Sequence, residues 1–177
     1  MRFVQMFGLC LLFGGFSLVL AGGIGVPKKE DVPKYMKQLS STNAADRAKA
    51  AEMLGKRGGI NSKDVEDAVE PLKTMLVKDK DAKVRAASAR ALGDIRADSE
   101  GTVPVLIDRI KSDSEVKDVK MAVVVALGQY GSDAKDALPK LREMLAKFDT
   151  KAAKKGMDAQ TIQAAITSIS GAKKKKN

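Results

Sequence analysis

The 177-residue sequence has no histidine and no tryptophan, and its single cysteine is Cys10. Histidine is the commonest general base and a preferred transition-metal ligand, and cysteine is a common nucleophile. Their scarcity argues against an enzyme, so we expect no catalytic residue, no cofactor, no metal site and no small-molecule substrate. Aromatic residues make up only 4% of the chain, and the core must therefore be mainly aliphatic.

Charge is also absent from a long stretch near the N-terminus, residues 3–26. An apolar segment that ends in small residues, here with Val19 and Ala21 before the cut, is typical of a secretory signal peptide. The same stretch is long enough to span a bilayer, so an uncleaved anchor that tethers the protein to the membrane is the alternative. We therefore expect residues 1–26 to be a signal peptide or anchor. The folded part, residues 27–172, is expected to be exported, periplasmic or extracellular.

The positive charge is concentrated at the C-terminal end. Residues 28–139 carry 21 Lys or Arg and 19 Asp or Glu, whereas residues 140–177 carry 10 and 3. The sequence ends in a basic tail, residues 173–177, which contains Lys173, Lys174, Lys175 and Lys176. These lysines suggest an alternative function, attachment to a polyanion or an anionic membrane surface, by an attraction that salt would screen.

What the sequence does contain is an internal repeat rich in alanine. The segment RAASARALG, which begins at Arg85, has counterparts that begin at Arg47, Lys120 and, more weakly, Gln163. We expect a glycine eight residues after each start to end a helix in the left-handed conformation. These glycines are Gly55, Gly93, Gly128 and Gly171.

A second, proline-containing segment precedes each of these stretches. The prolines are Pro33, Pro71, Pro104 and Pro139, and each is expected in the first turn of a helix. Short polar turns join this first helix (helix A) to the alanine-rich second helix (helix B), with Asn43 and Asp81 as expected N-caps. The spacing of 33 to 38 residues between prolines predicts four helical hairpins.

The residues Asp81, Val84, Arg85, Leu92 and Gly93 resemble HEAT repeats of the short type found in phycobilisome-lyase-like proteins. The resemblance covers about residues 31–171, although the fourth unit inserts KFDTKAAKKG between its helices. It implies an all-α fold, a right-handed α-solenoid of about four hairpins, and a non-catalytic scaffold for protein–protein interaction. The deoxyhypusine hydroxylases have similar helical units but bind iron through histidine–glutamate pairs, and this chain has no histidine.

The resemblance also implies roles for particular residues. Arg47, Arg85 and Lys120 are expected to form a structural ladder that reaches acidic or carbonyl groups at the turns of neighbouring units; contact with an anion is the alternative. Five residues after each start lie Glu52, Arg90, Val125 and Ser168, which are expected to face an unknown protein partner. This column has no single charge sign and no aromatic platform, so sequence-specific nucleic-acid binding is not expected.

The most apolar part of the repeat region comprises residues 102–110 and 121–127. A buried central hairpin explains this composition. An exposed hydrophobic groove for a peptide is the alternative, and it requires several of Val123, Val124 and Val125 to be accessible.

Overall fold

The computed structural model describes residues 25–148 and 156–171, and every regular element in those ranges is helical. The elements, in chain order, are η1 Lys29–Asp31, α1 Val32–Gln38, α2 Ala44–Gly58, η2 Ser62–Ala68, α3 Val69–Lys78, α4 Ala82–Ile95, α5 Ser99–Lys111, α6 Lys117–Tyr130, η3 Gly131–Ala137, α7 Leu138–Ala146 and α9 Met157–Ser170. Stretches of 3₁₀ helix, each seven residues long, separate α2 from α3 and α6 from α7.

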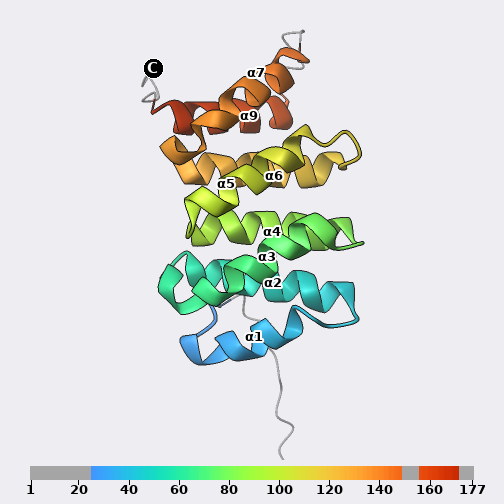
Figure 1. Cartoon of the computed structure of the whole chain (residues 1–177), viewed down its shortest axis with the longest axis vertical. Coiled ribbons are helices and arrows are strands. Elements are labelled where there is room, and N and C mark those ends of the chain that lie inside the picture. Colours follow the sequence, from blue (N-terminus) through green and yellow to red (C-terminus); the bar gives the residue numbers. More distant parts are fainter. Residues whose placement is uncertain (1–24, 149–155, 172–177) are drawn as a thin grey trace, which may run out of the picture.

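These helices pair into four hairpins, as the repeat predicts. The A helices are α1, α3, α5 and α7, and the B helices are α2, α4, α6 and α9. Each B helix packs directly against the next one, and each A helix packs against the B helix of its own unit. The B helices are therefore stacked one above another along the long axis of the molecule, and each runs across that axis (Figure 1). The A helices cross them obliquely (Figure 1). This arrangement is an α-solenoid.

The helix starts follow the sequence in most units. Asn43 and Asp81 are the N-caps of α2 and α4, and each side chain accepts backbone N–H hydrogen bonds, as predicted. The prediction for Pro104 is wrong, because Pro104 lies inside α5, which begins at Ser99. The connection before α5 is a tight turn in which Arg96 and Asp98 have positive φ, whereas 3₁₀ helices precede α3 and α7.

Three of the four predicted C-terminal glycines have a different role. Gly55, Gly93 and Gly128 lie inside their helices, and only Gly171 ends its helix with a positive φ of 65°. A Cβ atom on Gly93 would lie 2.7 Å from the Cα of Ala126 in the next B helix. The internal glycines are therefore points of close approach between successive B helices.

These contacts also correct the alignment of the fourth unit. Gly55 approaches Ala91, Gly93 approaches Ala126 and Gly128 approaches Ala165. Ala91 and Ala126 lie six residues after Arg85 and Lys120, so the equivalent start in the fourth unit is residue 159. The weak match that begins at Gln163 is thus displaced by one helical turn, because the inserted segment between α7 and α9 interrupts the repeat.

Aliphatic side chains from both layers fill the core. The A helices contribute Leu72, Leu76, Leu106, Ile110 and Leu141, and the B helices contribute Leu54, Leu92, Leu127, Ile162 and Ile169. Val123 and Val124 are fully buried, so the central hairpin is buried as predicted and the exposed-groove alternative is not supported. In the described ranges, no helix has both the length and the apolar character needed to cross a bilayer.

Candidate functional site

The ends of the units near the A–B turns are joined by arginine–carboxylate pairs. Arg47 on α2 donates from Nε and Nη2 to the carboxylate of Asp79, at 2.7 and 2.8 Å. Asp79 lies in the next A–B turn, and its side chain is only 8% exposed. Nη1 of Arg47 also donates to the carbonyl oxygens of Ser41 and Thr42, at 2.9 and 3.2 Å. One guanidinium therefore fastens two successive turns.

Arg85 on α4 repeats this arrangement one unit further on. Its Nε and Nη2 atoms donate to Glu115, with a shortest distance of 2.8 Å, and Nη1 donates to the carbonyl oxygens of Asp79 and Lys80. The Glu115 side chain is only 3% exposed. We call Arg47, Asp79, Arg85 and Glu115 the turn ladder. Planar guanidinium groups suit it because they bind a carboxylate through two donors and retain a third for carbonyl groups.

The turn ladder keeps both carboxylates ionised. Hydrogen bonds from Arg47 hold the pKa of Asp79 below its ordinary value, against the opposing effect of partial burial. Burial alone would raise the pKa of Glu115, but hydrogen bonds from Arg85 and the Val116 N–H bring it below its ordinary value. A carboxyl group whose pKa is lowered by folding stabilises the folded state at any pH above its pKa in the unfolded chain, which is about 4. This stabilisation is lost as the pH falls through the pKa of the group in the folded protein.

This linkage predicts an acid-dependent loss of stability. The free energy of unfolding should fall as the pH drops from about 5 to 2, and the fall should be shallower in the double variant Asp79→Asn, Glu115→Gln. The control is Glu66→Gln, Asp67→Asn, which removes the same number of carboxyl groups from exposed positions of η2. Urea unfolding followed by circular dichroism at each pH measures the slopes. Equal slopes in the two double variants would contradict the assignment.

Lys120 is the third expected ladder residue, and the structure places it differently. It is half-buried, and it forms no ion pair within residues 25–148 and 156–171. The first two units place a carboxylate of the following turn against this position. Instead, the ends of α6 and α9 are joined by Lys117 and Asp158, whose Nζ and Oδ2 atoms are 2.5 Å apart.

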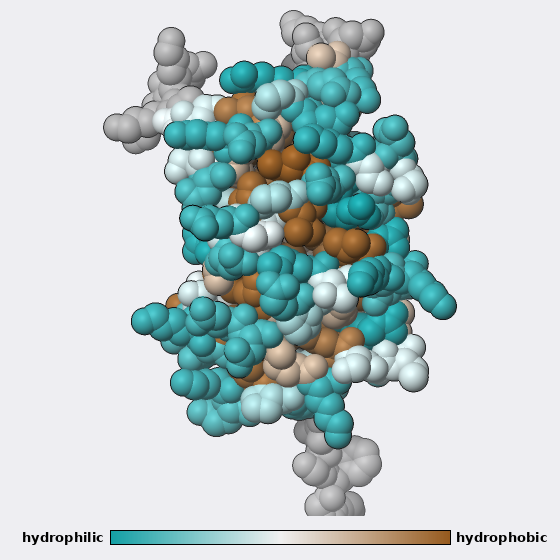
Figure 2. All heavy atoms as spheres, in the orientation of Figure 1, coloured by the Kyte–Doolittle hydropathy of each residue, from teal (hydrophilic) through white to brown (hydrophobic). Residues whose placement is uncertain are grey.

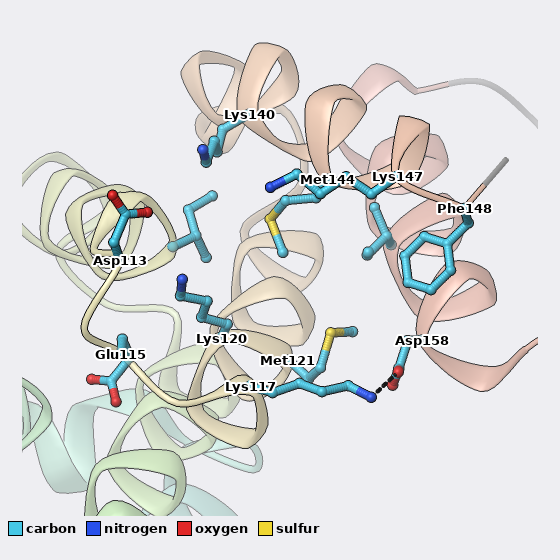
Figure 3. Close-up of a pocket in the computed structure, with 12 residues that line it drawn as sticks. Asp113, Glu115, Lys117, Lys120, Met121, Lys140, Met144, Lys147, Phe148 and Asp158 are labelled. Carbon is cyan, nitrogen blue, oxygen red and sulfur yellow. Dashed lines mark ion pairs between the residues drawn. The ribbon is translucent and has the colours of Figure 1, made fainter. Parts of the chain in front are cut away.

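A surface hollow of about 310 Å³ lies beside Lys120. Its apolar lining comes from Ile110, Met121, Met144, Phe148 and Ile162. Figure 3 shows that Met121, Met144 and Phe148 line it from α6, α7 and the residues just after α7, while Lys117 and Asp158 meet at one edge. We call this space the turn pocket. No feature of the repeat pattern indicated it, because it forms where the inserted segment breaks the repeat.

Among the residues that the structure describes, some of the charged side chains around the turn pocket form ion pairs, and others do not. Lys117, Lys120, Lys140 and Lys147 line it, together with Asp113, Glu115 and Asp158. Glu115 is committed to Arg85 and Asp158 to Lys117, while Lys140 and Lys147 contact Glu143. Hydrogen bonding to Asp158 raises the pKa of Lys117. Lys120 is therefore the lining ammonium that retains its full hydrogen-bonding capacity within the described ranges.

The expected partner surface lies on the side of the B helices that faces away from the A helices. Glu52, Arg90, Val125 and Ser168 are all exposed, although the corrected alignment makes Ala164 the true equivalent of Val125 in α9. A hollow of about 290 Å³ lies between α6 and α9 and is lined mainly by apolar atoms. Its lining comprises Val125, Gly128, Gln129, Thr161, Ala164, Ala165 and Ser168. We call this surface the B-helix face.

The opposite side, seen in Figure 2, has a different pattern. Hydrophilic residues cover both edges, and hydrophobic residues show through along the middle, where the A helices cross the B layer. Val77 on α3 is 42% exposed, close to the 41% of Val125. Substitutions at these two valines therefore allow the A-helix side and the B-helix face to be compared at positions of equal exposure.

The remaining predictions concern residues outside the described ranges. Residues 1–24 of the expected signal peptide or anchor lie there, as do Lys173, Lys174, Lys175 and Lys176 of the basic tail. In the described ranges, no group of three or more Cys, Asp or Glu side chains is arranged to hold a metal ion.

Comparison with known proteins agrees with the repeat architecture. A search of curated proteins finds no match. The family model described as HEAT repeats matches twice, over residues 32–118 and 69–157. The second match begins one unit after the first, and together they cover all of α1 to α7. The match does not distinguish the phycobilisome-lyase-like type, which stays a prediction. With its stacked hairpins and two overlapping matches, the chain belongs to the HEAT repeat family.

Proposed function

We propose that this protein is an exported, non-catalytic scaffold that binds a protein partner across its B-helix face. HEAT repeats commonly serve as scaffolds for protein interaction, and a stack of hairpins offers a long continuous surface. The observation that carries the proposal is the exposure of Val125 beside the apolar hollow between α6 and α9. An apolar centre with polar surroundings is the usual composition of a protein-binding surface.

The charges on the B-helix face support a protein as the partner. Glu52 and Arg90 have opposite signs, and Glu52 is paired with Lys56 on its own helix. A surface that binds phosphate groups needs aligned cations, whereas a protein interface tolerates mixed charges around its apolar centre. Export is supported by the uncharged N-terminal stretch with small residues at its end.

Site-specific photo-crosslinking tests the location of the surface. A photoreactive amino acid at position 125 is expected to yield a discrete protein adduct in the source cells, and the same residue at position 77 is not. The adduct protein, once purified, should bind Val125→Asp at least tenfold more weakly than the wild type, because the carboxylate would be desolvated in the interface without a partner.

Val77→Asp is the matched control, since the two valines are equally exposed and receive the same charge. We expect it to bind the partner within about twofold of the wild type, as remote surface changes usually do. Equal loss of binding in both variants, or equal crosslinking at positions 125 and 77, would rule out the B-helix face as the partner surface.

A further inference from the structure

The turn ladder contains two steps of the same geometry, the pairs Arg47–Asp79 and Arg85–Glu115. The third step, at Lys120, lacks the carboxylate within the described residues. In both pairs the cation near the start of a B helix binds a carboxylate from the following A–B turn. Asp79 lies three residues before α4 begins, and Glu115 lies two residues before α6 begins. The residues three and two positions before α9 are Lys154 and Lys155. At these two positions the chain carries lysine instead of an acid.

The space beside Lys120 is shaped for more than a carboxylate. The turn pocket places an apolar hollow next to the ammonium, and two of its lining residues, Ile110 and Ile162, are almost completely buried. Two other lining residues are Met121 and Met144, whose flexible, polarisable side chains adapt to different apolar shapes. Its volume of about 310 Å³ is at the lower end of the range for ligand pockets.

The other lysines of the rim are paired with acids, and the exposed Asp113 also lines the pocket, so the rim is nearly neutral overall. The side chains of Lys117 and Lys147 are 71% and 70% exposed, and each is paired with an acid that is itself partly exposed. Such surface pairs contribute little energy and are easily exchanged for another carboxylate. The buried Glu115 is already neutralised by Arg85, so it repels an incoming anion only weakly.

From these contacts we infer that the turn pocket binds an acidic segment of a protein partner, with one large apolar side chain in the hollow and a carboxylate on Lys120. The partner's carboxylate takes the place that Asp79 and Glu115 occupy in the earlier steps. This inference rests on the proposed scaffold function and adds a second, chemically defined contact at the edge of the stack. A polypeptide is the expected ligand because in both earlier steps the carboxylate belongs to a turn of polypeptide chain.

Methyl NMR of the full chain tests this directly. With ¹³C-methyl-labelled methionine, the capped peptide Ser-Glu-Leu-Glu-Phe-Glu-Ser is expected to shift the Met121 and Met144 signals in a saturable manner. Met53 and Met75, in the first two units, should not move. Replacing every Glu of the probe with Gln, or both of its apolar residues with Ser, should weaken binding by roughly tenfold, because each change removes one of the two contacts. Raising the salt concentration should also weaken binding.

The matched variants separate Lys120 from general basicity. Lys120→Gln is expected to bind the probe roughly tenfold more weakly than the wild type. Lys120→Arg keeps the positive charge and should retain most of the wild-type affinity. Lys83→Gln, an exposed change near the start of α4, should bind within about twofold of the wild type. The methyl spectra of the free variants test whether each one remains folded.

Three results would overturn the inference: no shift at Met121 and Met144, equal binding of the uncharged probe, or equal weakening by Lys83→Gln and Lys120→Gln. These results do not depend on the Val125 experiment. Failure at Val125 with intact methyl shifts would remove the B-helix face and leave the turn pocket, while the reverse pattern would remove only the pocket.

Discussion

Replacing Arg85 with alanine is expected to lower the free energy of unfolding by about 3 kcal/mol, because it leaves Glu115 buried without its main partner. The Glu115 side chain is only 3% exposed, and Arg109, at 3.8 Å, compensates for the loss only in part. The carbonyl oxygens of Asp79 and Lys80 lose a donor as well. Thermal and urea unfolding of the purified variant measure the effect.

Arg90→Ala is the control, because Arg90 lies on the same helix and is exposed. Its effect should stay within about 0.5 kcal/mol, as is usual for surface substitutions. The double variant Arg85→Met, Glu115→Leu should recover part of the lost stability, since it removes the unpaired charge together with its partner. Equal, negligible effects of Arg85→Ala and Arg90→Ala would show that the turn ladder does not hold the units together.

Replacing Gly93 with alanine is expected to lower the free energy of unfolding by about 2 kcal/mol through overpacking between α4 and α6. The new Cβ would lie 2.7 Å from the Cα of Ala126, which is backbone and can move only if the whole helix moves. It would also displace Gln129, whose Nε2 donates to Asp94 at 2.7 Å. The higher helix propensity of alanine, about 1 kcal/mol, offsets only part of this cost.

Two other glycines calibrate the effect. A Cβ on Gly128 would meet Ala165 at 3.1 Å, so Gly128→Ala should be less destabilising. A Cβ on Gly59 has no neighbour closer than 3.6 Å, so Gly59→Ala should be neutral or stabilising by about 0.5 kcal/mol. Unfolding experiments that rank the three variants in another order would contradict the close-approach interpretation.

The repeat architecture could be predicted from the sequence because several local signals agreed. The four prolines, the two N-cap residues Asn43 and Asp81, and the alanine-rich second helices all recur at similar intervals. The glycines recur too, but recurrence alone does not distinguish a helix end from a contact between helices. Only the distance from Gly93 to Ala126 decides this, and that distance depends on how two units pack.

The partners of the ladder residues were harder to predict than the arginines themselves. Asp79 follows Arg47 by 32 residues, and Glu115 follows Arg85 by 30, so neither the spacing nor the residue type is constant. The turn pocket was beyond prediction for a related reason. It depends on the irregular fourth unit, where the insertion removes the periodic signal on which sequence comparison relies.

Asp79 joins three units at one residue. Its carboxylate accepts hydrogen bonds from Arg47 of the first unit and from the Asp81 N–H of its own turn. Its carbonyl oxygen accepts a hydrogen bond from Arg85, which also donates to Glu115 of the third unit. In a stack whose stability is a sum over neighbours, such shared contacts are expected to make the first three units unfold cooperatively. In the described ranges no arginine–carboxylate pair joins the fourth unit to the third, and we expect α7 and α9 to open at a lower free energy than α3 to α6. The turn pocket lies at that boundary, where binding of a ligand would couple the last hairpin to the rest of the solenoid.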